Sequence, residues 1–376
     1  MPYLSSEALK GLKAYQYKAG GYTWLDDLHT PAWNYVVSKL PMWLAPNMIT
    51  LSGTLAVVMA YLLTIWYLPN FQGEAPRWVY AASAFSVFFY VNLDCIDGKQ
   101  ARRTGSSSPL GQLFDHGCDA LVVHILIANV IANFSHSCGW KVVVGALSIM
   151  TPWVLAQWEE YHTGMMLYSV SGLWGVLEAN YATAGVHVVT AVWGPAVWRL
   201  RPLGLPFELA DGALAGMTLA GAIQTAGQIW RVLKYDTSKM SKQERGHKEL
   251  GGGLAAWHLL FFLMLFLPAA MWLGAPTTAP GQCRAIFSSF GLTFALVSTQ
   301  LIVAHMGKVA FEPAWWSMCL VFVGAANVHL QLFDGPALSF IIAATILCGY
   351  LHYVTSVVNE ICQFLNIWCL WIKKSS

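Results

Sequence analysis

The sequence has few charged residues for its size. Of its 376 residues, 21 are Lys or Arg and 19 are Asp or Glu, so charged residues make up 11%, against roughly 25% in a typical soluble domain. Such a chain is not disordered, because disorder needs high charge and few aromatic residues, whereas aromatics here reach 14%. With 56% hydrophobic residues, it is not an ordinary soluble protein either. The net charge of +2 gives no support for nucleic-acid binding, which uses a concentrated basic face.

The sequence also lacks the spacing of small cysteine-rich domains. Its eight cysteines are scattered singly and none forms a C-x-x-C pair, so neither a zinc knuckle nor a small disulfide scaffold is indicated. We predict buried free thiols. Residues 1–20 contain no apolar stretch of signal-peptide length, so entry into a membrane depends on later segments.

Long stretches without Asp, Glu, Lys or Arg recur along the rest of the chain. They cover residues 47–73, 120–140, 179–198, 212–230, 254–273, 285–307, 313–333 and 335–359, with shorter ones at 78–93 and 142–158. About 20 apolar residues cross the hydrocarbon core of a bilayer as a helix. Counted as one span each, these stretches predict an all-α, polytopic membrane protein with about ten transmembrane helices.

The first 45 residues have a different character. Leu4, Ala8, Leu9, Leu12 and Tyr15 recur at helical spacing beside several lysines, which is typical of a helix lying in the membrane interface. An ordinary surface helix packed on the protein is the alternative.

The basic residues predict the orientation. The longest polar loop, 231–249, is rich in Lys and Arg, and such loops stay in the cytosol. Alternating spans then place both termini and the Arg102–Arg103 pair in the cytosol as well. Lys373–Lys374 is typical of a retrieval signal for the endoplasmic reticulum, although a snorkelling anchor for the last helix fits nearly as well.

One charged segment, residues 93–121, interrupts the apolar pattern. Asp94 and Asp97 are spaced i, i+3 at the end of one predicted helix, and Asp115 and Asp119 are spaced i, i+4 at the start of the next. Each pair therefore projects from one helical face. The connection between them contains Gly, three Ser and Pro, which is typical of a turn. Two antiparallel helices would thus bring four carboxylates together near the cytosolic surface.

Four neighbouring carboxylates cannot all stay ionised unaided, so either some are protonated or cations lie between them. Carboxylate oxygens suit a hard divalent ion, Mg²⁺ or Mn²⁺, better than zinc. Mg²⁺ held by few carboxylates usually completes its shell with substrate phosphates. Gly98, Ala101 and Gly111 leave room for a ligand near the backbone, and Arg102 offers a planar donor for a phosphate.

Eight residues of this segment match every fixed position in the signature of the CDP-alcohol phosphotransferases. They are Asp94, Asp97, Gly98, Ala101, Arg102, Gly111, Asp115 and Asp119. The flanking sequence, including LPMWLAPNMITLSG at 40–53, resembles the eukaryotic choline/ethanolamine phosphotransferase branch. The resemblance runs through the third predicted span and is looser beyond it.

The resemblance suggests four parts: an N-terminal interfacial or cytosolic helical segment (1–45), a catalytic membrane domain (46–230), a basic cytosolic loop (231–250) and C-terminal transmembrane helices (251–376). It also implies the reaction. The hydroxyl of diacylglycerol would attack the β-phosphorus of CDP-choline or CDP-ethanolamine and release CMP, in the membrane of the endoplasmic reticulum or Golgi. A homodimer is expected from the family.

The family's ligand sets can be carried over onto the matching residues. Asp94, Asp97 and Asp115 would hold one Mg²⁺ or Mn²⁺ ion, and Asp94, Asp115 and Asp119 a second. Arg102 would contact the pyrophosphate, and Asn47 would help to seat the nucleotide. Gly98 and Ala101 would make room for cytidine.

His116, beside Asp115, is the candidate acceptor for the proton of the diacylglycerol hydroxyl, because an imidazole near neutral pKa suits that role. Relatives usually carry Glu four residues earlier, where this chain has Gln112. A neutral amide can hydrogen-bond the ring but cannot stabilise an imidazolium electrostatically. The chain is therefore a slower enzyme, relies on Asp119, or is a variant with an altered acid–base pair.

Three alternatives stay open. A prenyl-diphosphate transferase would usually show two aspartate motifs, but only one acidic cluster is present. A transporter would place acidic residues in the middle of several helices. An inactive relative that binds nucleotide without turnover is consistent with Gln112.

Overall fold

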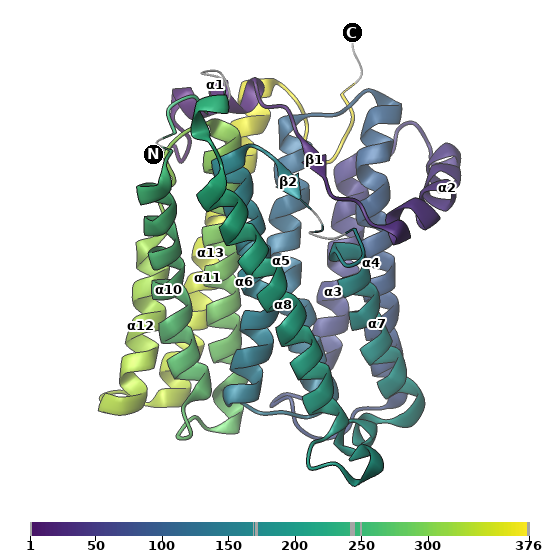
Figure 1. Ribbon diagram of the computed structural model, residues 1–376, viewed down its shortest axis with the longest axis vertical. Helices are drawn as coiled ribbons and strands as arrows, with labels where there is room; N and C mark the ends of the chain where they lie inside the picture. Colours follow the sequence, from purple (N-terminus) through teal and green to yellow (C-terminus); the bar gives the residue numbers. More distant parts are fainter. Residues whose placement is uncertain (1, 168, 170–171, 241–244, 249, 374–376) are drawn as a thin grey trace.

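The protein is described by a computed structural model that covers all residues except 1, 168, 170–171, 241–244, 249 and 374–376. Among the described residues, each of the ten predicted stretches coincides largely with one long α-helix. These are α3 (Pro46–Tyr67), α4 (Arg77–Thr104), α5 (Pro109–Phe134), α6 (Trp140–Thr163), α7 (Val176–Trp193), α8 (Leu209–Lys234), α10 (Gly252–Gly274), α11 (Cys283–Gly307), α12 (Trp315–Leu330) and α13 (Gly335–Leu365). They run up and down through one bundle (Figure 1).

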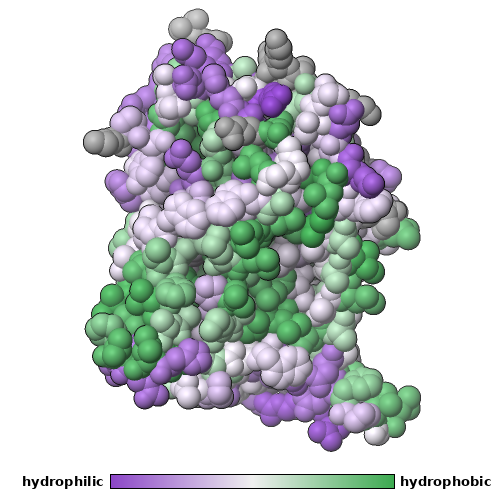
Figure 2. Space-filling model, turned by 60° about the vertical axis from the view of Figure 1, so that its left-hand side comes forward, coloured by the Kyte–Doolittle hydropathy of each residue, from purple (hydrophilic) through white to green (hydrophobic). Residues whose placement is uncertain are grey.

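Seven of these helices, within the described residues, are long and apolar enough to cross a membrane: α3, α4, α5, α6, α10, α11 and α13. On the face that Figure 2 shows, apolar side chains form a broad band across the middle of the molecule, and hydrophilic residues gather toward both ends. The all-α, polytopic prediction is thus confirmed. The number of spans stays a prediction, since α7, α8 and α12 are not among the seven.

The turn between α4 and α5 is short and well defined. Gly105 ends α4 with a left-handed φ of 65°, a conformation that glycine adopts without steric cost. Ser108 begins α5 because its side chain accepts a hydrogen bond from the Gly111 N–H at 3.1 Å, and Pro109 occupies the first turn. This tight connection reverses the chain direction and brings the acidic ends of α4 and α5 close together, while both helices pack on α3.

Helix α11 lies in the interior of the bundle, with 89% of its most apolar window buried. It packs against α5, α6 and α13. Gly291 of α11 lies against the His124 ring of α5, where an added Cβ would come within 2.4 Å of the ring. Because other helices surround α11, most of its side chains are buried, and its sequence is therefore apolar on every face.

The N-terminal segment forms α1 (Ser6–Lys13), the strand β1 (Ala19–Gly20) and α2 (Trp24–Lys39). Strand β1 pairs in parallel with β2 (Met166–Leu167). In α1 the apolar residues Ala8 and Leu12 are buried and the helix packs on α11, which favours the packed surface helix over the interfacial one. Helix α2 instead exposes Trp24, Leu28 and Tyr35, as an interfacial helix would.

Four short 3₁₀ turns complete the described structure. They are η1 (Pro195–Arg199), η2 (Pro202–Gly204), η3 (Thr237–Lys239) and η4 (Pro280–Gln282). Lys242, in the predicted basic loop, and Lys374 lie outside the described residues.

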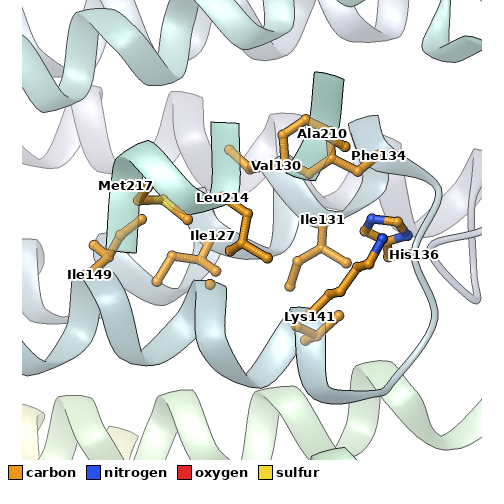
Figure 3. A pocket seen from close by; sticks show the side chains of 12 residues that line it. Ile127, Val130, Ile131, Phe134, His136, Lys141, Ile149, Ala210, Leu214 and Met217 are labelled. Carbon is orange, nitrogen blue, oxygen red and sulfur yellow. The ribbon is translucent and has the colours of Figure 1, made fainter. Parts of the chain in front are cut away.

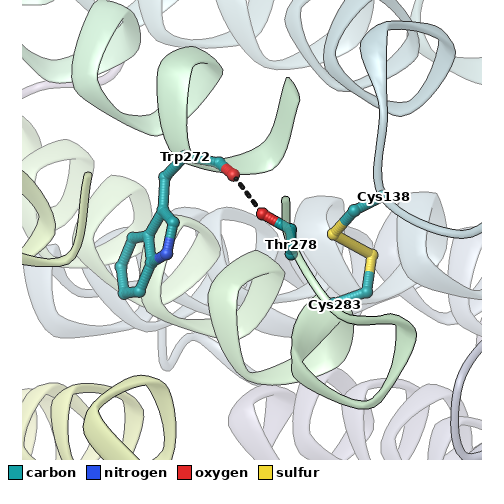
Figure 4. The surroundings of a disulfide bond; sticks show 4 residues. All are labelled: Cys138, Trp272, Thr278 and Cys283. Atoms are coloured by element: carbon teal, nitrogen blue, oxygen red, sulfur yellow. Dashed lines mark hydrogen bonds between the residues drawn. A yellow bond between two sulfur atoms is a disulfide. The ribbon is translucent and has the colours of Figure 1, made fainter. Parts of the chain in front are cut away.

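The prediction of buried free thiols was wrong in two respects: one pair forms a disulfide, and of the six free cysteines two are exposed and four are half-buried. Cys138, in the connection between α5 and α6, forms a disulfide with Cys283 at the start of α11, 145 residues along the chain (Figure 4). Sequence spacing carries no signal for a link between such distant segments. The disulfide lies at the end of the bundle opposite to the α4–α5 turn, the two termini and α1 (Figure 1).

Candidate active site

The four aspartates predicted from the sequence come from the last three turns of α4 and the first three of α5. Oxygen atoms of Asp94, Asp97 and Asp115 all lie within 4.8 Å of one another, as in a site that holds a metal ion. Asp119 lies one turn beyond Asp115 and within electrostatic range of Asp94. We call these four residues the acidic cluster. Asp97 is only 6% exposed, and the other three are half-buried.

Two side chains, one from α3 and one from α4, donate hydrogen bonds to the acidic cluster. The Thr50 hydroxyl of α3 bonds Asp97 Oδ2, and the Tyr90 hydroxyl of α4 bonds Asp119 Oδ1. Asp94 Oδ1 and Asp115 Oδ1 are buried without a hydrogen-bond partner. Buried carboxylate oxygens without partners are unfavourable unless a cation or donor reaches them. The acidic cluster therefore fits a divalent cation bound through oxygen ligands.

The other predicted binding residues surround the acidic cluster. A Cβ on Gly98 would lie 3.5 Å from the guanidinium of the exposed Arg102, so the glycine leaves that side of α4 open. Ala101 is half-buried. A Cβ on Gly111 would lie 3.5 Å from Asn47 Oδ1, which brings the start of α3 against the first turn of α5. Small residues thus add little side-chain bulk beside the carboxylates.

His116 is buried beside the acidic cluster, with its Nε2 3.9 Å from Asp115 Oδ2. Gln112 Nε2 lies 2.6 Å from His116 Nε2. Because an amide nitrogen only donates, the ring nitrogen accepts this bond and the neutral ring carries its proton on Nδ1. The structure thus brings Gln112 and His116 together, and it also places Gln157 of α6 against the ring.

Three residues that touch the site were missed by the sequence reasoning: Thr50, Tyr90 and Gln157. Thr50 follows Asn47 by three positions and Tyr90 precedes Asp94 by four, so helical periodicity from the predicted residues was a usable signal for both. Gln157 reaches His116 only through the packing of α6 on α5. No local pattern points to it.

A separate pocket lies between α5, α6 and α8 (Figure 3), against the last turns of α5 and not the first turns that carry Asp115 and Asp119. Its walls are mostly apolar, formed by residues such as Ile127, Ile131 and Met217, with Lys141 at one edge. The Lys141 ammonium is bound by Asp211 at 2.6 Å. The described residues that line this pocket include no carboxylate.

Comparisons with known proteins agree with the site. A family model for CDP-alcohol phosphatidyltransferases matches residues 43–198. Cholinephosphotransferase 1 of Xenopus laevis is 33% identical over 97% of this chain and 89% of its own length. Choline/ethanolaminephosphotransferase 2 of Arabidopsis thaliana is 30% identical over 100% of this chain and 99% of its own. An uncharacterised CDP-alcohol phosphatidyltransferase class-I protein of Dictyostelium discoideum is 39% identical over 97% and 87%.

Proposed function

The chain belongs to the CDP-alcohol phosphatidyltransferase family, and on that premise we propose that it makes phosphatidylcholine, phosphatidylethanolamine or both. It would transfer the phospho-alcohol of CDP-choline or CDP-ethanolamine to the hydroxyl of diacylglycerol and release CMP. The observation that carries this proposal is the acidic cluster, with buried oxygens lacking a partner, at one end of a membrane bundle.

The acidic cluster would hold two ions, Mg²⁺ or Mn²⁺. Asp94, Asp97 and Asp115 would be the ligands of the first, and Asp94, Asp115 and Asp119 those of the second. Such ions bind the two phosphates and neutralise charge on the leaving CMP. Thr50 and Tyr90 supply hydrogen bonds that hold two of the carboxylates in place.

The remaining site residues bind and orient the substrates. Arg102, exposed beside Gly98, is free to reach a phosphate as a two-pronged donor. Gly98, Ala101 and Gly111 leave the space that the nucleoside needs, and Asn47 borders it. His116 accepts the proton of the attacking hydroxyl once the Gln112 amide turns away from Nε2.

Gln112 supports a second candidate function, a nucleotide-binding relative with impaired turnover. Its amide occupies the ring nitrogen that a free base would use. The acidic cluster and the small residues beside it would still bind a CDP-alcohol. Among the described residues there is one cluster of three carboxylates at ligand distance, which makes a prenyl-diphosphate transferase with two such motifs the weaker alternative.

We also propose that the site faces the cytosol of the endoplasmic reticulum or Golgi. Helix α1, the described part of the basic loop and the helix ends that carry the acidic cluster share one end of the bundle, and the Cys138–Cys283 disulfide lies at the other (Figure 1). Disulfides persist in the lumen and not in the cytosol. We further propose that the chain divides into four parts, at residues 45, 230 and 250, and that it forms a homodimer.

The test is CMP release from each CDP-alcohol with diacylglycerol, with Mg²⁺, with Mn²⁺ and with chelator. We expect metal-dependent release that is lost on Asp94→Asn and kept on Asp27→Asn, an exposed aspartate of α2 that serves as the matched control. Release that survives both chelation and Asp94→Asn contradicts the proposed chemistry. A chain that binds CMP but releases none from either CDP-alcohol, whichever diacylglycerol is supplied, is the impaired relative.

A further inference from the structure

The segment that follows α13, Asn366–Lys373, does not extend away from the bundle. Asn366 ends α13 in a left-handed conformation with φ 55°, and the Ile367 N–H returns to the Cys362 carbonyl at 3.1 Å. Lys373 Nζ donates to Asn366 Oδ1 at 2.7 Å, which folds the segment back on itself. In Figure 1 this yellow segment dips toward the ends of α3 and α5 before it rises to the C-terminus.

The segment contacts Asn47 through Cys369. Asn47 Nδ2 donates to the main-chain carbonyl of Cys369 at 2.9 Å and lies 3.8 Å from its Sγ. Asn47 is only 7% exposed, so water competes little for this bond. The side chains of Trp368 and Trp371 are 64% and 65% exposed, so the segment does not owe its position to burying these rings.

This bond fixes which way the Asn47 amide faces. A carbonyl accepts and cannot donate, so the amide NH₂ must point to Cys369 and Oδ1 must point away from it. Oδ1 lies beside Gly111, one turn before Asp115, because a Cβ on Gly111 would be 3.5 Å from it. An acceptor is thereby presented on the side of α3 that borders the acidic cluster.

We propose that the C-terminal segment is part of the nucleotide subsite and that the Cys369 carbonyl positions Asn47 so that Oδ1 accepts a hydrogen bond from the bound nucleotide. The inference rests on the proposed function and adds a role for residues more than 300 positions from Asn47. Two groups of a cytidine nucleotide can donate such a bond, the amino group of the base and the hydroxyls of the ribose. Cys369 is a positioning residue, since it acts through Asn47.

The first test is a chain that ends at Asn366, compared with the full chain in the same detergent. We expect the KM for CDP-choline and the Kd for CMP to rise about threefold to tenfold, as for the loss of one neutral hydrogen bond. The KM for diacylglycerol, kcat and Tm should stay unchanged. Cys369→Ala, which keeps the main-chain carbonyl, is the matched control and should bind CMP like the parent.

The second test is a double-mutant cycle. If the segment acts through Asn47, truncation should add no further loss of CMP affinity to Asn47→Ala. Additive losses, or an unchanged CMP affinity in the truncated chain, overturn the inference. If the truncated chain does not fold, insertion of two glycines after Asn366 shifts the Cys369 carbonyl within an otherwise complete chain and carries the same expectation.

UMP distinguishes the two possible donors. A loss confined to CMP identifies the base amino group, because uracil has a carbonyl there, and an equal loss for UMP identifies a ribose hydroxyl. A full-length chain that neither binds CMP nor releases it refutes the proposed function itself. A full-length chain that does both, with a truncated chain that matches it, refutes only the role of the C-terminal segment.

Discussion

Two buried polar clusters lie at the same end of the bundle, and they differ in how their charges are balanced. The acidic cluster contains four carboxylates and no basic side chain. The other, which we call the Lys248 cluster, consists of Tyr15, Glu160, Lys248 and His305, and it brings its own cation and donors. Both clusters are built from ionisable groups that would be costly to bury alone.

Each member of the Lys248 cluster has a partner within it. The Tyr15 hydroxyl donates to Glu160 Oε1 at 3.0 Å, and His305 Nε2 lies 3.5 Å from the same oxygen. Lys248 Nζ donates to His305 Nδ1 at 2.8 Å and lies 4.7 Å from the centre of the Tyr161 ring. Burial and the Glu160 charge raise the pKa of Tyr15, which keeps its hydroxyl a donor.

The contrast separates a structural site from a binding site. The Lys248 cluster ties α1, α6, α11 and the loop before α10 together and leaves nothing for a ligand to neutralise. The acidic cluster has two buried oxygens without a partner, and the single charge of Arg102, which acts on Asp97, does not balance four carboxylates, so the cluster needs a bound cation. Mutations in the two clusters should therefore fail in opposite ways.

The largest effect is expected from Asp115→Asn. Loss of a shared metal ligand should lower CMP release by about 1000-fold, because metal ions contribute several kcal/mol to such transfers. The thermal midpoint in chelator should not fall, since the substitution removes one of several crowded carboxylates. Both are measured on detergent-purified protein. A lower thermal midpoint with an unchanged rate of CMP release per folded molecule would reverse the assignment of the two clusters.

Glu160→Gln should do the reverse. It leaves Lys248 and His305 buried without their carboxylate, a change that costs about 3 kcal/mol or more in comparable buried pairs. The thermal midpoint should drop, while the rate of CMP release per folded molecule stays within about threefold of the parent. Glu7→Gln, on the exposed face of α1, is the control and should change neither. A large loss of rate at an unchanged midpoint would give Glu160 a catalytic role.

The same contrast explains what the sequence could and could not predict. The acidic cluster comes from two helices joined by a four-residue turn, so i, i+3 and i, i+4 spacing was sufficient to bring its members together. The ten helices followed from apolar runs for the same local reason. His116 and Gln112 are one turn apart, and their contact was predicted from that spacing.

The Lys248 cluster and the disulfide join segments that are distant in the chain. Glu160 and Tyr15 are 145 residues apart, and so are Cys138 and Cys283. Their pairing depends on how α1, α6 and α11 pack, which no local pattern encodes. The contact of Asn47 with Cys369, 322 residues away, is of the same kind.

A smaller effect is expected from Gln112→Glu. A carboxylate in place of the amide would stabilise the imidazolium that forms when the ring accepts the proton. General-base catalysis is worth 10² or more when intact, so recovery of part of it predicts a rise in kcat of about tenfold. The rate is measured with saturating CDP-choline. Gln157→Glu, on the other side of the ring, tests whether any added carboxylate has the same effect; an unchanged kcat in Gln112→Glu means that the amide does not limit turnover.

The smallest effect concerns pH and stability. Burial lowers the pKa of Lys248 from 10.5 to about 7, with Lys308 acting in the same direction and Glu160 opposing it. Between pH 7 and about 10 the unfolded chain therefore binds a proton that the folded chain does not, so the free energy of unfolding rises with pH over this range. We expect the thermal midpoint of the parent to rise from pH 7 to pH 9 by more than that of Lys248→Met, which lacks the titrating group. His305, Glu160 and Tyr161 face the same ammonium. His305→Gln should therefore keep the rise in stability with pH but change the pH at which half of the rise has occurred. Equal slopes in the parent and Lys248→Met would mean that the folded protein keeps Lys248 charged over this pH range.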